Sequence, residues 1–205
     1  VSASGMGSIS STIMQLCKSG DHIVSSRTIY GGTYAFMKNF LPRLNISTSF
    51  VDTTNLGSVK SAICNDTKIL YCETMSNPLL EISDIKKLAE LAHENNLKLI
   101  VDNTFTPLIF SPAELGADIV IHSLTKYIGG QGNSLGGVIV DAGTFNWANG
   151  KFPEFTEPSA GYHGLVYHEA LGAASYTFKL ILEGLRDFGG ALSPTNAFQI
   201  IQGLE

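Results

Sequence analysis

Short apolar runs that alternate with amphipathic segments are the feature that most limits what this chain can fold into. The runs "KILYCET", "LKLIVD" and "DIVIH" have continuous apolar cores, which is typical of strands buried on both faces of a parallel sheet. Between the first two runs, apolar residues recur at helical spacing and predict an amphipathic helix: Ile82, Ile85, Leu88, Ala89 and Ala92. This alternation predicts an α/β fold, in which a mainly parallel sheet carries helices on both faces.

The rest of the chain continues this pattern. We expect helices after Ser4 and over residues 31–43 and 58–65, and strands over residues 21–26 and 46–52. The stretch "SPAELG" has the Ser-x-x-Glu spacing of a capping box and predicts a short helix. The strand predicted in "SLGGVIVD" follows a glycine-rich loop rather than a helix, so it can run antiparallel to its predecessor. That loop lacks G-x-G-x-x-G and leads into a strand, which argues against a dinucleotide site. We expect a single domain.

Composition narrows the possible partners. Charged residues make up only 15% and hydrophobic residues 44%, so we expect part of the surface to be covered in a homo-oligomer. A net charge of -5 without a basic run excludes nucleic acid and anionic membranes as partners. Apolar runs stay below the ~18 residues that span a bilayer. Cys17, Cys64 and Cys72 lack CxxC spacing and predict reduced, buried thiols in the cytoplasm. The chain begins at Val1 and ends within an amphipathic segment, so we expect a fragment of a longer protein.

Four residues with reactive or polar side chains follow predicted strands: Tyr30, Asn77, Asp102 and Lys126. Carboxyl ends of parallel strands meet at one edge of a sheet, so we expect these side chains to lie close together. Taken singly, each has an ordinary alternative, such as a solvated lysine or a turn aspartate. An unpaired ammonium directly after an apolar strand is costly unless its amine is bound or its pKa is lowered, which favours a functional Lys126.

Together these residues meet the needs of pyridoxal phosphate (PLP). This cofactor requires a lysine amine, an acid beside the ring nitrogen, a flat partner for the ring and a cup for the phosphate. Gly5 at a helix start, with the hydroxyls of Ser123 and Thr125, provides a candidate phosphate cup. His163 and His168 are five residues apart without a nearby cysteine, a poor metal pattern, so we expect no metal.

The motifs "SASGMGS", "SSRTIYGGTY", "ETMSNP", "VDNTF" and "HSLTKYIGG" span almost the whole chain. In this order they resemble the Cys/Met-metabolism enzymes, which use PLP on the aspartate-aminotransferase fold (fold type I). The resemblance implies that Lys126 holds the cofactor and that Tyr30 stacks on its ring and helps the leaving group depart. It also implies further contacts: the backbone of Gly5 and Met6, with Ser123 and Thr125, to the phosphate; Asn77 to the ring hydroxyl; Asp102 to the pyridine nitrogen. Glu73 matches an acidic family position without a definite role.

Within the family, "GTFNWANGKFPEFTEPSAGYHG" is similar to a segment of O-acetylhomoserine sulfhydrylases, and Gly32 replaces the cysteine of typical methionine γ-lyases. The resemblance implies a cytoplasmic homotetramer that converts O-acetylhomoserine and sulfide, or a thiol, to homocysteine, or methionine, and acetate. Cystathionine γ-synthase, cystathionine γ-lyase and methionine γ-lyase are the alternatives. The phenylalanines and prolines of "FPEFTEP" would either wall a closed substrate pocket or form a surface loop.

We interpret residues 1–205 as the cofactor-binding large domain, without an N-terminal arm or a C-terminal small domain. The arginine that grips the substrate carboxylate in this family has no matching motif here. A truncated cofactor-binding scaffold without turnover is therefore the non-enzymatic alternative.

Overall fold

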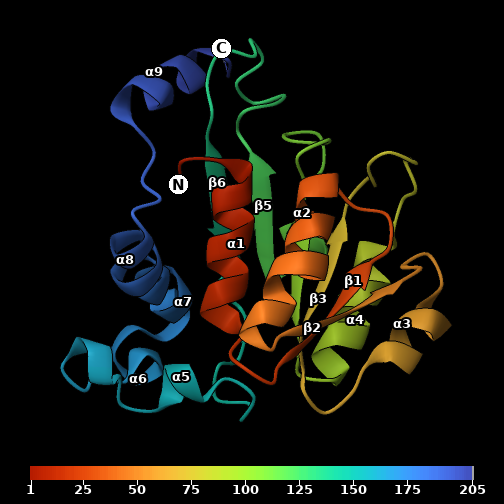
Figure 1. Cartoon of the computed structure of the whole chain (residues 1–205), viewed down its shortest axis with the longest axis vertical. Helices are drawn as coiled ribbons and strands as arrows, with labels where there is room; N and C mark the ends of the chain where they lie inside the picture. The colour runs from red at the N-terminus through yellow and green to blue at the C-terminus, as the bar shows by residue number, and fades with distance from the viewer. Residues whose placement is uncertain (205) are drawn as a thin grey trace.

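The computed structural model describes residues 1–204, and its centre is one six-stranded sheet. The strands are β1 (His22–Ser26), β2 (Ser47–Val51), β3 (Thr67–Glu73), β4 (Lys98–Asp102), β5 (Ile119–Ser123) and β6 (Gly137–Asp141). Their order across the sheet is β2-β1-β3-β4-β5-β6, and β1 to β5 run parallel (Figure 1). Strand β6 pairs with β5 in the antiparallel sense. The predicted α/β fold is confirmed, as is the reversed last strand.

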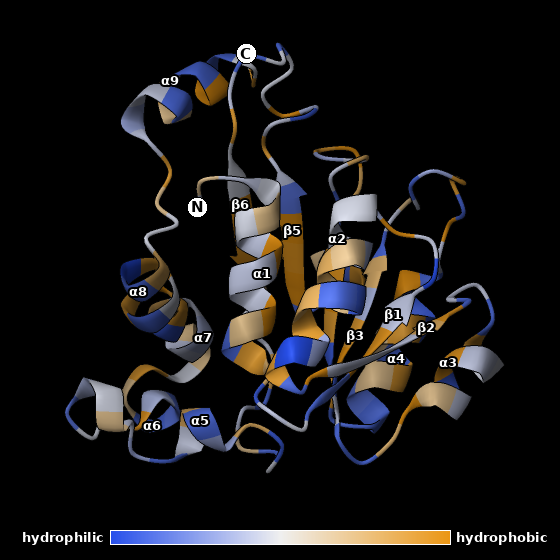
Figure 2. Cartoon of the chain, in the orientation of Figure 1, coloured by the Kyte–Doolittle hydropathy of each residue, from blue (hydrophilic) through white to orange (hydrophobic). Residues whose placement is uncertain are grey.

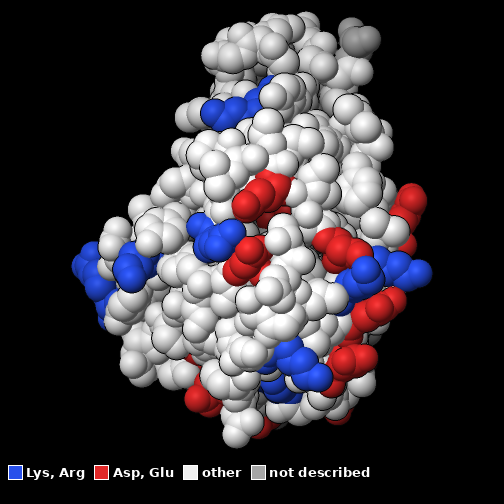
Figure 3. All heavy atoms as spheres, turned by 90° about the vertical axis from the view of Figure 1, so that its right-hand side faces the viewer, with Lys and Arg blue, Asp and Glu red and all other residues white. Residues whose placement is uncertain are grey.

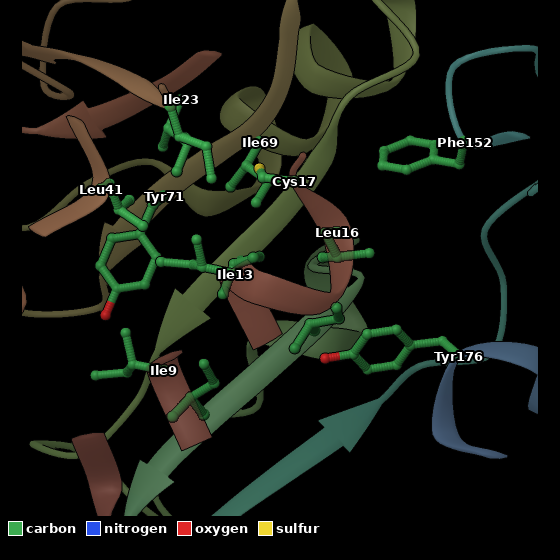
Figure 4. Close-up of a cluster of buried hydrophobic side chains, with 14 of the residues drawn as sticks. Ile9, Ile13, Leu16, Cys17, Ile23, Leu41, Ile69, Tyr71, Phe152 and Tyr176 are labelled. Carbon is green, nitrogen blue, oxygen red and sulfur yellow. The ribbon is translucent and has the colours of Figure 1, made fainter. Parts of the chain in front are cut away.

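Helices cover both faces of the sheet, and the side chains of each strand alternate between them. On one face lie α1 (Gly5–Leu16) and a helical stretch that begins with α2 (Gly31–Ala35) and continues through Phe36–Phe40 and Leu41–Leu44. The other face carries α3 (Leu56–Ala62) and α4 (Ile85–Glu94). In β3, Ile69 and Tyr71 pack on the α1 side, whereas Leu70 and Cys72 pack on the α4 side. Figure 4 shows Ile9 and Ile13 of α1 beside Tyr71, and Figure 2 shows that hydrophobic residues concentrate on the strands.

After β6 the chain adds a set of short helices on the α1 side of the sheet. They are α5 (Pro153–Thr156), α6 (Tyr167–Leu171), α7 (Ser175–Lys179) and α8 (Arg186–Phe188), whereas the last helix, α9 (Pro194–Gln202), packs against the loop between β5 and β6 (Figure 1). A helical turn over Leu180–Leu185 joins α7 to α8.

The "FPEFTEP" segment is neither a pocket wall nor a surface loop. Phe152 and Phe155 are fully buried with Trp147, and the Trp147 and Phe155 rings stack at 3.9 Å between centroids. The Nζ of Lys98, the first residue of β4, lies 4.1 Å from the Trp147 ring centre, which places this aromatic cluster at the amino ends of the strands. Aromatic faces attract a cation, so the buried lysine and the rings stabilise one another.

Three smaller predictions are wrong. Residues Pro112–Leu115 form one helical turn, but the Ser111 side chain makes no capping hydrogen bond, so "SPAELG" is not a capping box. Ile82 lies outside α4 and is exposed, because Asp84 caps the helix by accepting from the N–H of Lys87. Cys64 is exposed, whereas Cys17 and Cys72 are buried as expected.

Charges of both signs are interspersed on the face of the molecule that Figure 3 shows, and neither sign gathers there. Among residues 1–204, no helix is both long enough and apolar enough to cross a bilayer.

Candidate active site

A cavity of about 840 Å³ opens where the carboxyl ends of the strands meet the start of α1. The sequence predicted eight residues here, and all eight line this cavity: Gly5, Met6, Tyr30, Asn77, Asp102, Ser123, Thr125 and Lys126. They come from four strand ends and one helix start, so the parallel sheet brings together residues that are far apart in the chain. The structure places these side chains together but does not by itself assign their roles.

The start of α1 supplies a site for an anion. Ser4 caps the helix by accepting a hydrogen bond from the N–H of Gly7 at 3.0 Å. The N–H groups of Gly5 and Met6 precede the first backbone bond of the helix, at its positive end. A Cβ on Gly5 would lie 2.6 Å from the Cβ of Ser123, so only glycine lets the helix start approach the end of β5 this closely. A phosphate fits the donor set of this corner.

The hydroxyl of Thr125 also contacts the segment that leads into β6. It accepts from the N–H of Gly136 at 3.2 Å and lies 3.3 Å from the Gly136 carbonyl oxygen. Thr125 therefore ties the turn after β5 to the segment that leads into β6, as well as lining the cavity.

Asp102 ends β4 as a nearly buried carboxylate. Its Oδ1 accepts from the backbone N–H of Thr104 at 3.0 Å and from the Thr104 hydroxyl at 2.5 Å, and that hydroxyl accepts from the N–H of Ser123 at 2.8 Å. Burial raises the pKa of Asp102 above its usual value, although the Thr104 hydrogen bonds oppose this. Within residues 1–204, no Lys, Arg or His side chain forms an ion pair with Asp102 at 4.0 Å or less. A protonated ring nitrogen would supply the cation that this carboxylate lacks.

Glu73 ends β3, directly opposite Asp102 in the sheet register. Its Oε1 accepts from the N–H of Tyr30 at 2.7 Å and its Oε2 from the N–H of Asn77 at 2.9 Å. Burial raises the pKa of Glu73 to about 7, with a smaller contribution from the negative charge of Asp102. Sequence reasoning matched Glu73 to a family position but gave it no role. Its place at the end of the buried run "KILYCE" was the available signal.

Tyr30 precedes α2, lines the cavity and is about half exposed. Gly32 packs against this ring, since a Cβ on Gly32 would lie 2.5 Å from the Cε1 of Tyr30. Phe105 and Tyr127 also line the cavity, with ring centres 6.0 Å apart in an edge-to-face arrangement. Neither was predicted, because each comes from a loop whose position depends on the sheet.

Lys126 lies in the turn that follows β5, and its side chain is exposed at the cavity. Its ammonium is therefore solvated, and the predicted cost of burying it is wrong. Its position in the cavity with Asp102 agrees with the sequence prediction. His163 and His168 do not line the cavity, and within residues 1–204 no group of three or more His, Cys, Asp or Glu side chains is placed to hold a metal ion.

Comparison with known proteins identifies the family. A family model described as "Cys/Met metabolism PLP-dependent enzyme" matches residues 1–205. The chain belongs to this family. PLP is the cofactor of the Cys/Met metabolism enzymes, and the cavity offers an amine, an unpaired buried carboxylate, an aromatic ring and an anion site for it.

Individual members of the family are similar over nearly the whole chain. The O-acetyl-L-homoserine sulfhydrylase of Leptospira meyeri is 42% identical over 99% of this chain and 48% of its own length. The homocysteine synthase of Schizosaccharomyces pombe is 44% identical over the same shares. A Campylobacter jejuni structure that contains N'-pyridoxyl-lysine-5'-monophosphate superposes with a TM-score of 0.93, at 34% identity, over 99% of this chain and 50% of that one.

The chain thus spans about half the length of the curated relatives it matches. The superposition confirms the predicted aspartate-aminotransferase-like, fold type I architecture.

Proposed function

We propose that this chain carries the cofactor site of a PLP-dependent transferase that performs γ-replacement. O-acetylhomoserine and sulfide, or a thiol, would give homocysteine, or methionine, and acetate. The observation that carries the proposal is the convergence of Lys126, Asp102 and Tyr30 in one cavity beside an anion site. Support for the substrate comes from the relatives named for O-acetylhomoserine sulfhydrylation and homocysteine synthesis.

Each cavity residue then has a task in holding the cofactor. Lys126 would bind it covalently, and Asp102 would keep the ring nitrogen protonated by its negative charge. The Tyr30 ring would stack on the cofactor, and the Asn77 side chain would contact its ring hydroxyl. The helix start at Gly5 and Met6, with the hydroxyls of Ser123 and Thr125, would hold the phosphate.

When bound, PLP supplies a ring that accepts the negative charge developed at the substrate Cα. Lys126 would hold the cofactor until substrate binds, and its freed amine would then act as general base on the Cα proton, after which a second proton would leave Cβ. The Tyr30 side chain lines the cavity, and its hydroxyl would donate a hydrogen bond to the acetate that departs from Cγ. Sulfide would then add at Cγ, and both protons would return, one to Cβ and one from the Lys126 amine to Cα.

The test supplies the cofactor-loaded protein with O-acetylhomoserine and sulfide, and measures homocysteine, acetate and 2-oxobutyrate together. Homocysteine and acetate in equal amounts support γ-replacement. A product that is mainly 2-oxobutyrate at saturating sulfide, or methanethiol released from methionine, assigns the chain to the lyases instead. Preference for O-succinylhomoserine with cysteine points to cystathionine γ-synthase. Bound cofactor without any product supports the non-enzymatic scaffold.

We also propose that the protein is a homo-oligomer, and a homotetramer by family resemblance. Apolar side chains stand out on the loops beside the cavity, and such exposed groups are typical of a surface that another subunit covers. They are Leu79, Leu80, Ile82, Leu108 and Ile109, and the last two are about 85% exposed. The cysteines Cys17, Cys64 and Cys72 are free thiols, which is typical of a cytoplasmic protein.

A further inference from the structure

Two loops beside the cavity are attached to the same carboxylate. Glu73 is only 7% exposed, and each of its two oxygens accepts one backbone N–H, from Tyr30 at 2.7 Å and from Asn77 at 2.9 Å. The two donors lie after different strands, Tyr30 after β1 and Asn77 after β3. A carboxylate that accepts from a backbone N–H makes a charge-assisted hydrogen bond, which is about twice as strong as a neutral one.

Little else fixes the two side chains. Within residues 1–204, no hydrogen bond holds the hydroxyl of Tyr30 or the side-chain amide of Asn77. Tyr30 also caps α2 without a side-chain hydrogen bond, and its ring is about half exposed. The position of both side chains is therefore set mainly by the backbone to which each is attached, and Glu73 anchors that backbone in both loops.

We propose that Glu73 is a positioning residue, whose carboxylate holds Tyr30 and Asn77 at the distance from each other that the cofactor ring requires. The inference rests on the proposed function, because it takes from it the tasks of Tyr30 and Asn77. It adds a role for a residue that does not itself react. Glu73 acts through the two loops, so its loss shifts both contacts to the ring together.

Both oxygens are needed, which makes the protonated acid a poor substitute. When Glu73 gains a proton, one oxygen becomes a donor and faces an N–H group that needs an acceptor. Burial raises the pKa of Glu73 to about 7, and the negative charge of Asp102 on β4 adds to this. The other titratable groups that line the cavity are Lys126, Tyr30 and Tyr127. Above pH 7 the carboxylate accepts from the N–H groups of both loops, and below pH 7 the protonated acid keeps one good acceptor for the two N–H groups.

The experiment compares Glu73→Gln with Glu81→Gln in the cofactor-loaded protein. The first keeps the size of the side chain but turns an NH₂ group toward one of the two donors. The second is the matched control, because Glu81 lies in the same loop as Asn77, accepts from the Thr28 hydroxyl and pairs with Arg27 at 3.8 Å, but accepts from neither the Tyr30 nor the Asn77 N–H. Hydrogen exchange of the Tyr30 and Asn77 amides is measured at single-amide resolution. At pH 8, Glu73→Gln is expected to speed exchange by about 10-fold or more at the amide that faces the NH₂ group, because that donor is left unpaired. Exchange at the other amide should rise by less, because it keeps a neutral carbonyl acceptor but loses the charge-assisted hydrogen bond.

Two further readouts separate positioning from general loosening. The difference in exchange between the wild type and Glu73→Gln should narrow at pH 6, where the wild type also carries a proton. Turnover in Glu73→Gln should fall by about 10- to 100-fold with KM changed by less than about 3-fold, because the contacts to the ring shift while the substrate contacts stay. Glu73→Asp keeps two acceptors on a shorter side chain. Its amide exchange and turnover are expected to lie between those of the wild type and of Glu73→Gln, so it provides the test if Glu73→Gln does not fold.

The outcomes distinguish this inference from the proposed function. Wild-type exchange at both amides in Glu73→Gln and Glu73→Asp overturns the inference, whether or not the enzyme makes homocysteine. Faster exchange at both amides with unchanged turnover also overturns it, because the loops then move without effect on the reaction. A wild type that makes no homocysteine refutes the proposed function, and the exchange data still decide whether Glu73 anchors both loops.

Discussion

Replacing Gly32 with alanine should displace the Tyr30 ring. The added Cβ would lie 2.5 Å from the Cε1 and 3.2 Å from the Cζ of Tyr30, and 3.3 Å from the Sδ of Met6. Carbon atoms pack best at about 3.5–4.0 Å, so the ring must retreat by about 1 Å. Because the ring is half exposed, it can move outward, and the substitution should cost catalysis more than stability. A displacement of about 1 Å in a catalytic group can cost about 100-fold in rate.

Gly31→Ala is the matched control, since a Cβ on Gly31 meets nothing within 4 Å and both glycines lie in the first turn of α2. We expect Gly31→Ala to keep wild-type turnover and to gain up to about 1 kcal/mol in stability, since alanine loses less backbone entropy than glycine in a helix. The assay is the steady-state rate of homocysteine formation, with the melting temperature of each variant measured in parallel. Turnover of Gly32→Ala within about 3-fold of wild type would refute the reasoning. An equal loss in Gly31→Ala would also refute it, because the effect would then come from the helix start.

Three other predictions concern the cofactor, the aromatic cluster and the assembly. Asp102→Asn should keep bound PLP, seen in the visible spectrum, but lose about 100-fold or more in turnover, since an amide lacks the charge that keeps the ring nitrogen protonated; near-normal turnover would contradict this. Burial lowers the pKa of Lys98 from 10.5 to about 8. Between these pH values the unfolded state binds more protons than the folded state, so the folded state becomes more stable as the pH rises. In denaturant titrations, the free energy of unfolding of the wild type should rise by up to about 3 kcal/mol relative to Lys98→Met between pH 8 and 10.5. A difference in unfolding free energy between the two proteins that stays the same from pH 8 to 10.5 would contradict a lowered pKa of Lys98. Light scattering should show a homo-oligomer of the cofactor-loaded protein. A monomer would contradict the proposal that another subunit covers the exposed apolar loops beside the cavity.

The residues that share the cavity were predictable because most of them follow apolar runs. Asp102 and Lys126 are polar residues directly after buried strands, and the rule that parallel strands end at one edge is enough to place them together. The alternation of strands and helices likewise predicted the sheet, and the glycine-rich loop indicated that β6 is reversed.

Features that depend on distant contacts were not predictable in this way. Glu73 works through backbone N–H groups of two separate loops, and no local pattern marks such a partner. The burial of Phe152 and Phe155 depends on Trp147 and on residues of α6 and α7, which pack with them in the same core. Lys126 is exposed because the turn after β5 leaves the sheet at once, so the apolar strand before it says nothing about its burial.

The site of covalent attachment tests the central claim most directly. Borohydride reduction of the cofactor-loaded protein, followed by peptide mapping, locates the residue that carries the pyridoxyl group. The account predicts the adduct on Lys126, in the peptide that contains "HSLTKYIGG". An adduct on any other lysine, or a protein that binds PLP without a reducible bond, would contradict it.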